Sequence, residues 1–174
     1  MKYAITGHTA GIGLSLYRLL NPNCIGFSRT TGHNINMKQN RESIISDSAD
    51  CDVFINNAYS DINQVNLLYE LYEIWKDSDK IIVNIGSETT CGIKNHPHIY
   101  TAHKIALDKA SEQLSHLDNK CKVINIRFGW VGTPRVLAKF NPKSYIEVDD
   151  AAKYILEQVI WSTKYRVTEC LVRP

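Results

Sequence analysis

Short apolar runs alternate with amphipathic segments along almost the whole chain. Several of these runs are continuous and β-branched, as in Ile81-Ile82-Val83. Such runs are typical of strands that are buried on both faces of a parallel sheet. The pattern predicts about seven strands, the third of them weak. They are Tyr3–Thr6, Cys24–Phe27, Asn34–Met37, Asp52–Asn56, Lys80–Ile85, Lys122–Arg127 and Thr168–Val172.

Between these runs, apolar residues recur at the three- and four-residue spacing of helices. The expected helices are Ile12–Leu20, Arg41–Ala49, Leu67–Trp75, Ile105–Leu117 and Ala151–Ile160. Alternation of strands and helices predicts an α/β fold, a Rossmann-like doubly wound parallel sheet with helices on both faces. The sequence shows no internal repeat, low-complexity tract or linker, so we expect residues 1–174 to form one domain.

Composition narrows the class of protein. The 174 residues are 44% hydrophobic and 22% charged, with a net charge of +2, which is too small to favour a nucleic-acid or membrane partner. The five cysteines are widely spaced without a Cys-x-x-Cys pair, which favours reduced thiols and a cytoplasmic location. We expect no secretory signal, no membrane span and no metal site, and we interpret His96-Pro97-His98 as a polar loop.

A glycine-rich segment, Thr6-Gly7-His8-Thr9-Ala10-Gly11-Ile12-Gly13, follows the first strand and opens the first helix. Glycines permit a tight turn and a close approach of the backbone to a pyrophosphate, which the helix N-terminus attracts. We therefore expect a dinucleotide cradle made by Gly7, Thr9, Gly11, Ile12 and Gly13. The alternative is an ordinary strand-to-helix turn, because the spacing is Gly-x-x-x-Gly-x-Gly rather than Gly-x-Gly-x-x-Gly.

The end of the second strand bears on the choice of dinucleotide. Dinucleotide-binding units often place an acidic residue there, where it binds the ribose 2′-hydroxyl. Here the chain has Ser28, Arg29 and Thr30 and no carboxylate. A guanidinium pairs with phosphate in a bidentate fork, so these residues favour the 2′-phosphate of NADP, with NAD as the alternative.

Tyr100 and Lys104 are four residues apart in a helical pattern, and Ser87 follows an apolar run upstream. Residues four apart share one face of a helix. An ammonium beside a phenol favours the phenolate, so we expect a lowered pKa for Tyr100 and proton exchange nearer neutral pH. The alternative is a strand-end serine, an interface aromatic and a solvated lysine.

These elements occur in the order Thr6-Gly7-x-x-x-Gly11-x-Gly13, Asn56-Asn57-Ala58, Ser87, Tyr100-x-x-x-Lys104, and together they resemble the short-chain dehydrogenase/reductase family. The resemblance covers nearly the whole chain, which is shorter than most members. It implies an NAD(P)-dependent oxidoreductase that transfers hydride between nicotinamide and a small carbonyl or alcohol substrate.

The resemblance also implies roles for single residues. Tyr100 is the general acid/base, Ser87 holds the reacting oxygen, and Lys104 lowers the pKa of Tyr100 and binds the nicotinamide ribose. Asn66 helps a proton-relay water to reach Lys104, and Asn63 is the alternative residue for that role. The expected cofactor contacts beyond the cradle are Ser28, Arg29, Thr30, Asn56, Ala58, Tyr100, Lys104, Val131 and Thr133.

Three positions depart from the family pattern. Tyr59 stands where the family usually has glycine, and it is expected to narrow the cleft. Phe128 replaces a proline before Gly129, and Asn34 stands near the usual place of an acidic residue beside the adenine. A second hypothesis is therefore an NADP-binding sensor or scaffold without turnover. A third, a sugar-nucleotide epimerase or dehydratase, expects a larger substrate domain.

The resemblance further implies a homodimer or homotetramer, with contacts through the helices at Leu67–Trp75 and Tyr100–Leu117. Tyr69, Tyr72 and Trp75 are candidates for that contact or for the core. We expect Glu88–Ile99 and Pro134–Val148, a short lid, to shape the substrate pocket. The sequence does not identify the substrate.

Overall fold

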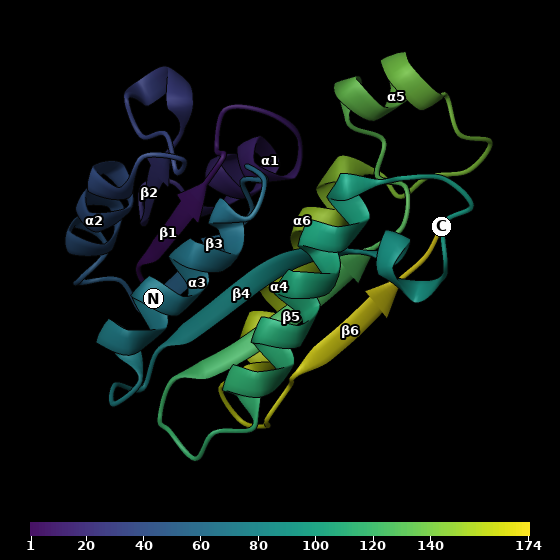
Figure 1. Ribbon diagram of the computed structural model, residues 1–174. Helices are drawn as coiled ribbons and strands as arrows, with labels where there is room; N and C mark the ends of the chain where they lie inside the picture. Colours follow the sequence, from purple (N-terminus) through teal and green to yellow (C-terminus); the bar gives the residue numbers. More distant parts are fainter.

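A computed structural model describes all residues, Met1–Pro174, as one sheet covered by helices on both faces (Figure 1). The sheet has six parallel strands in the order β2-β1-β3-β4-β5-β6. They are β1 (Tyr3–Thr6), β2 (Cys24–Phe27), β3 (Val53–Asn56), β4 (Ile81–Ser87), β5 (Lys122–Phe128) and β6 (Glu169–Val172). The Rossmann-like doubly wound fold predicted from the sequence is confirmed.

The helices divide between the two faces of the sheet. One core joins the sheet to α2 (Lys38–Asp47), α3 (Asn63–Trp75) and α4 (Ile99–Ser115). The other core joins it to α1 (Gly11–Leu20) and α6 (Val148–Ser162). Helices α1, α3, α4 and α6 each bury an apolar stripe, which contributes about 1.5–3 kcal/mol for each large side chain removed from water, whereas α2 buries mainly Ile44 and Arg41. Tyr72 and Trp75 are buried in the core, whereas Tyr69 is exposed.

The expected strand at Asn34–Met37 is absent, so the prediction of about seven strands is wrong by one. The reason lies in local polar contacts. The side chain of Asn34 accepts a hydrogen bond from the backbone N–H of Asn36, a turn that competes with a strand ladder. The carbonyl of Ile35 accepts from the buried Arg41 guanidinium instead of from a neighbouring strand.

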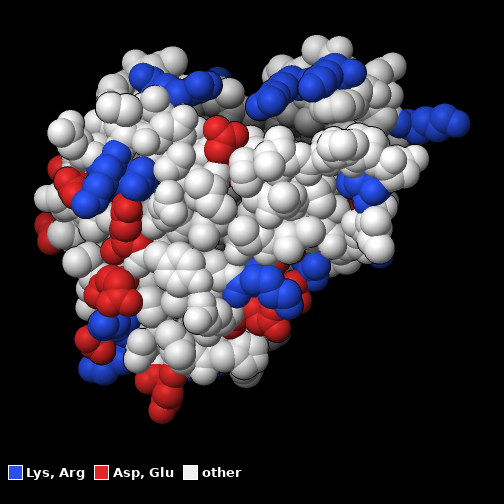
Figure 2. Space-filling view, in the orientation of Figure 1, with Lys and Arg blue, Asp and Glu red and all other residues white.

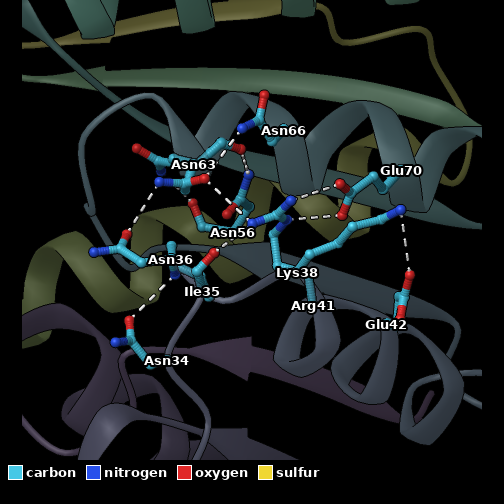
Figure 3. Close-up of polar contacts among 11 residues, drawn as sticks. Asn34, Ile35, Asn36, Lys38, Arg41, Glu42, Asn56, Asn63, Asn66 and Glu70 are labelled. Atoms are coloured by element: carbon cyan, nitrogen blue, oxygen red, sulfur yellow. Dashed lines mark hydrogen bonds and ion pairs between the residues drawn. The ribbon is translucent and has the colours of Figure 1, made fainter.

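Arg41 holds this segment against α3 (Figure 3). Its guanidinium donates two hydrogen bonds of 2.8 Å to the carboxylate of Glu70 and one of 3.2 Å to the side-chain oxygen of Asn63. Asn63 in turn donates to Asn36 at 3.1 Å. Residues 34–37 therefore form a polar turn beside the start of α3, and β2 remains the outermost strand on that side of the sheet.

The chain after β5 contains a helix that the hydrophobic pattern did not indicate. Helix α5 (Pro134–Phe140) stands beyond the carboxyl ends of the strands (Figure 1). Proline occupies its first turn, and the Thr133 side chain accepts a hydrogen bond from the N–H of Val136. Both features are typical of helix starts. The expected lid at Pro134–Val148 is thus partly helical, and α5 lies over the carboxyl ends of the strands.

Candidate active site

The parallel strands bring the predicted site residues to one edge of the sheet, because all their carboxyl ends lie there. The strand order reverses at β1, whose neighbours are β2 and β3. The glycine turn follows β1 at that point. Asn56 is the last residue of β3, and Ser87 is the last residue of β4.

The glycine turn has the backbone conformation that glycine favours. Gly7 and Gly11 have φ values of +76° and +54°, in the left-handed region. A Cβ at Gly13 would collide with the carbonyl oxygen of Gly7. The turn therefore requires these glycines, and it leaves Thr9 exposed just before the N-terminus of α1.

The neighbouring segments close around the turn. The Thr6 hydroxyl accepts hydrogen bonds of 3.0 Å from the backbone N–H groups of Asn57 and Ala58, which joins the ends of β1 and β3. A Cβ at Gly11 would lie 3.0 Å from the Thr133 methyl group. Thr133 and the glycine turn are therefore in contact, although they are far apart in the sequence.

The residues that follow β2 lie on the other side of the glycine turn from β3. Ser28 is buried, and its backbone N–H and hydroxyl both pair with the Thr31 hydroxyl. Arg29 and Thr30 follow in a short 3-10 turn and are exposed. Arg29 forms no ion pair within the chain. Its guanidinium is available to an anion at this edge.

Figure 2 shows Lys and Arg side chains along both sides of the upper edge, where the turn after β2 and helix α5 lie in Figure 1. Arg29 belongs to the first segment, and Arg135 and Lys139 belong to α5. The rim of the site is therefore positive on both sides. A positive rim favours an anionic ligand such as a dinucleotide.

Helix α4 brings Tyr100 and Lys104 onto its inner face beside Ser87. A hydroxyl–hydroxyl hydrogen bond of 2.7 Å between Thr89 and Thr101 connects the turn after β4 to the first turn of α4. The structure thus brings Ser87, Tyr100 and Lys104 together, as the sequence predicted.

The electrostatics of Tyr100 differ from the expectation. Burial raises the pKa of Tyr100, and this effect outweighs the nearby Ser87 hydroxyl and the charge of Arg135, both of which lower it. The expectation that Lys104 lowers the pKa of Tyr100 is wrong here. The lysine is itself buried, which disfavours the positive charge that would stabilise the phenolate. Burial lowers the pKa of Lys104 to about 7. Near neutral pH the phenol therefore holds its proton more firmly than the amine does.

Lys104 donates to two neutral oxygens rather than to a carboxylate. Its Nζ lies 2.8 Å from Oε1 of Gln64 and 2.6 Å from the carbonyl oxygen of Ile85. Asn66, expected to serve the lysine through a water, instead donates to the side-chain oxygen of Asn63 at 3.1 Å (Figure 3). Asn63 is itself held by Arg41.

Gln64 is the residue that the sequence interpretation missed. Its side chain is buried on α3, and its amide also donates to the carbonyl oxygen of Asn56 at 2.7 Å. Asn56 returns a hydrogen bond to the Gln64 backbone. A signal was available in the pattern, because Gln64 is three and four residues before Leu67 and Leu68 and so falls on the apolar stripe of α3.

Tyr59, the bulky departure from the family pattern, lies within the site. Its ring packs against the ring of Tyr100, and Lys104 Nζ lies 5.6 Å from its ring centroid. The Tyr59 hydroxyl is 3.0 Å from Nδ1 of His103. The aromatic side chain therefore covers the lysine on the side of the cleft, where a glycine would leave it open.

The remaining predicted contacts lie around the same edge. Val131 is buried and pairs with Ile146, which holds the segment before α5 against the start of α6. Residues 91–99 are exposed and leave the substrate side open. No helix combines the length and apolar character needed to cross a bilayer, and no cluster of three His, Cys, Asp or Glu side chains could hold a metal.

No family model and no curated protein sequence matches the chain. Its structure, however, is similar to solved oxidoreductase structures. A 3-alpha-hydroxysteroid dehydrogenase from Pseudomonas sp. B-0831, solved with NADH, is 16% identical with a TM-score of 0.84, over 99% of this chain and 95% of that chain. A short chain dehydrogenase/reductase family protein is 17% identical with a TM-score of 0.81, again over 99% and 95%.

A serine dehydrogenase in its closed form with NADP⁺ is 16% identical with a TM-score of 0.76, over 99% of this chain and 94% of that chain. At these identities the similarity concerns the arrangement of the backbone. The chain therefore has the fold of the short-chain dehydrogenases/reductases.

Proposed function

We propose that this chain is an NAD(P)-dependent oxidoreductase, with NADP preferred, that transfers hydride between nicotinamide and a carbonyl or alcohol substrate. One observation carries the proposal: Ser87, Tyr100 and Lys104 lie together at the same sheet edge as the glycine turn. An ordinary glycine-rich turn does not require an acid/base group beside it. The structural neighbours solved with NADH and NADP⁺ support the general class of cofactor.

The residues at this edge fit a dinucleotide. Gly7, Gly11 and Gly13 permit close approach of a pyrophosphate to the backbone and to the N-terminus of α1. Ala58, Val131 and Thr133 complete the proposed cofactor wall, with Ile12 and Thr9 beside the turn. Asn56, expected to line the cleft, is fully buried, and its side chain is bonded to Gln64 and Asn84. The bound dinucleotide would supply hydride chemistry that no protein side chain supplies.

The protein's own part is the management of one proton. Tyr100 donates it to the carbonyl oxygen during reduction or accepts it from the alcohol during oxidation. Ser87 donates a hydrogen bond to the same oxygen and stabilises the charge that develops there. The raised pKa of Tyr100 keeps the phenol protonated at neutral pH, which suits the direction of carbonyl reduction.

The preference for NADP follows from the end of β2. Arg29 is exposed, has no partner in an ion pair and follows the buried Ser28. A carboxylate that would repel a 2′-phosphate is missing from this turn. Arg29, Ser28 and Thr30 are therefore the proposed partners of that phosphate.

A binding titration tests this proposal. NADPH and NADH are added to the wild type and to Arg29→Ala, and intrinsic tryptophan fluorescence is recorded. We expect tighter binding of NADPH and a loss of about tenfold or more in NADPH affinity, but not in NADH affinity, in the variant. Arg18→Ala, an exposed arginine in the last turn of α1, is the matched control. Absence of binding of either nucleotide would refute the proposal.

A second candidate is an NADP-binding sensor or scaffold without turnover. The specific observation in its favour is Tyr59, whose ring occupies the cleft against Tyr100. The two functions separate when the protein is mixed with NADPH and a panel of aldehydes and ketones. Loss of nicotinamide absorbance indicates the enzyme, whereas tight binding without any loss of absorbance indicates the sensor.

The proposed assembly is a homodimer or homotetramer formed through α3 and α4. Tyr69, Ile74 and Ile105 are exposed apolar residues on these helices, and Leu117 follows α4 closely. Burying such side chains against a second copy removes apolar surface from water. Sedimentation equilibrium tests the proposal, and a monomeric mass would contradict it.

A further inference from the structure

Lys104 is buried in a pocket of neutral polar groups. Only 3% of the residue is exposed, and its ammonium donates to the side-chain oxygen of Gln64 and to the carbonyl oxygen of Ile85. No carboxylate lies within ion-pair distance of it. A lysine charge that is removed from water without a counter-ion is strongly destabilised.

The rings of Tyr59 and Tyr100 form the remaining wall of this pocket. Lys104 Nζ lies 5.6 Å and 5.7 Å from their centroids. Such contacts favour a cation only weakly compared with an ion pair. With two acceptors for three N–H bonds, one N–H of the ammonium is directed toward neither oxygen. The amine is therefore held rigidly, and one of its protons remains available.

The charged and titratable groups that face this pocket are few. On α4 they are Tyr100 and Asp108, and Asp108 is the one carboxylate that favours the charged lysine. Tyr59 precedes α3, and Arg135 on α5 acts on both phenols. Burial outweighs Asp108 and lowers the pKa of Lys104 to about 7.

Gln64 is the side chain that creates this arrangement. It is 1% exposed and fixed at both ends, because its amide donates to the Asn56 carbonyl and its oxygen accepts from Lys104. Asn56 is fixed in turn by a hydrogen bond of 2.9 Å to the side chain of Asn84. Gln64 therefore offers Lys104 a rigid neutral oxygen at the place where a glutamate would offer a charge.

We propose that Gln64, rather than Asn66, is the positioning residue of Lys104, and that it holds the amine without a counter-ion so that Lys104 exchanges a proton readily. The role of this exchange in catalysis rests on the proposed oxidoreductase function, whereas the exchange itself does not. During reduction, the O–H bond of Tyr100 breaks as its proton passes to the carbonyl oxygen. The phenolate regains a proton that the Lys104 ammonium releases and that water carries between them, because Lys104 Nζ is hydrogen-bonded to Gln64 and Ile85 and not to Tyr100. The neutral amine then recovers a proton from the solvent.

The test is a titration of Lys104 by NMR in the cofactor-free protein. The protein is labelled with lysine carrying ¹³C at Cε, and the Lys104 signal is assigned with Lys104→Met. We expect a midpoint near pH 7 for Lys104, whereas exposed lysines titrate at about 10.4. A wild-type midpoint above about 9 would overturn the proposal.

The variant Gln64→Glu places a carboxylate against the amine at nearly constant shape. We expect the Lys104 midpoint to rise by about one to three pH units, because an opposite charge at hydrogen-bond distance favours the ammonium. Gln39→Glu is the matched control. Gln39 is exposed on α2, so this substitution makes the same change of charge away from Lys104. An equal midpoint in Gln64→Glu and the wild type would overturn the role of Gln64.

The titration of Lys104 and the nucleotide-binding experiment test two proposals separately, so that either proposal can be refuted without the other. Absence of NADPH binding refutes the oxidoreductase proposal, and the Lys104 midpoint is measured without any nucleotide. The wild-type midpoint also requires no substitution, so a poorly folded Gln64→Glu does not prevent a decision. In that case Gln64→Met provides the second variant. We then expect the Lys104 signal to broaden or move at constant pH, because the amine loses one fixed acceptor.

Discussion

The ring of Tyr59 meets the ring of Tyr100 edge-on, with centroids 4.8 Å apart and planes inclined at 71°. This geometry is favourable for an aromatic pair. It also means that Tyr59, at a position where the family usually has glycine, covers the ring of the proposed acid/base group. Tyr59 is held in turn by His103, which lies 4.0 Å from the carboxylate of Asp61.

Truncation of Tyr59 should hydrate the lysine pocket. In Tyr59→Ala we expect the Lys104 midpoint to rise by about one pH unit, because water at the cleft side reduces the burial penalty that lowers it. The ¹³C titration measures this shift. Tyr59→Phe keeps the ring and removes only the hydroxyl, so its midpoint should equal that of the wild type. An unchanged midpoint in Tyr59→Ala would show that the ring does not shield the amine.

Loss of the phenol hydroxyl should affect turnover more than folding. In Tyr100→Phe we expect carbonyl reduction to fall by about 10²–10⁴-fold, the usual contribution of general acid/base catalysis. The ring contacts remain, so thermal unfolding and NADPH affinity should stay near wild-type values. Tyr69→Phe, an exposed tyrosine bonded to Gln113, is the control and should keep full activity. A Tyr100→Phe protein with undiminished turnover contradicts the proposed acid/base role.

The pattern of hydrophobic and polar residues was enough to predict most of the fold, for a physical reason. Runs such as Ile81-Ile82-Val83 are buried on both faces of the sheet, so their burial is encoded in consecutive residues. Tyr100 and Lys104 were predictable as a pair because helical spacing places them on one face. Ser87 was predictable because it ends a strand, and parallel strands end at one edge.

Contacts between distant residues explain what the sequence did not indicate. The segment Asn34–Met37 looked like a weak strand, but Arg41 takes the Ile35 carbonyl only because Glu70, on another helix, fixes the guanidinium. Gln64 looked like a polar residue of a helix start, and only the fold brings Lys104 to it. The Tyr100 pKa was misjudged because burial, which spacing does not reveal, dominates it.

The Arg41–Glu70 pair should stabilise the turn at residues 34–37. In Glu70→Gln we expect a loss of about 2 kcal/mol in the free energy of unfolding, because the guanidinium, 7% exposed, loses its counter-ion. Urea unfolding measures this change. Glu42→Gln removes the partner of Lys38 in an exposed pair on α2 and should cost less than about 0.5 kcal/mol. Equal costs for the two variants would mean that burial of Arg41 adds nothing.

The buried Lys104 should make stability depend on pH in a defined direction. Its pKa is about 7 in the folded protein and about 10.4 in the unfolded chain. Between these values the unfolded chain binds the proton and the folded protein does not, so the free energy of unfolding rises with pH. The expected contribution is up to about 1.4 kcal/mol for each pH unit, and it ends below pH 7, where both states hold the proton.

Urea unfolding at pH 6.5, 7.5 and 8.5 measures this slope on the wild type and on Lys104→Met. At the upper end of this range the buried thiols Cys24 and Cys121, whose pKa values burial raises to about 12, begin to ionise in the unfolded chain, where thiols titrate at about 8.5. That ionisation lowers the free energy of unfolding equally in the wild type and in Lys104→Met, so the comparison of the two slopes isolates Lys104. The variant should lose the rise between pH 7.5 and 8.5, because methionine has no proton to release. Its stability at any one pH is less informative, since Gln64 and Ile85 each lose a donor at every pH. Lys153→Met, a change at an exposed lysine of α6, should keep the wild-type slope. If Lys104→Met also kept that slope, the amine would be protonated in the folded protein throughout this range.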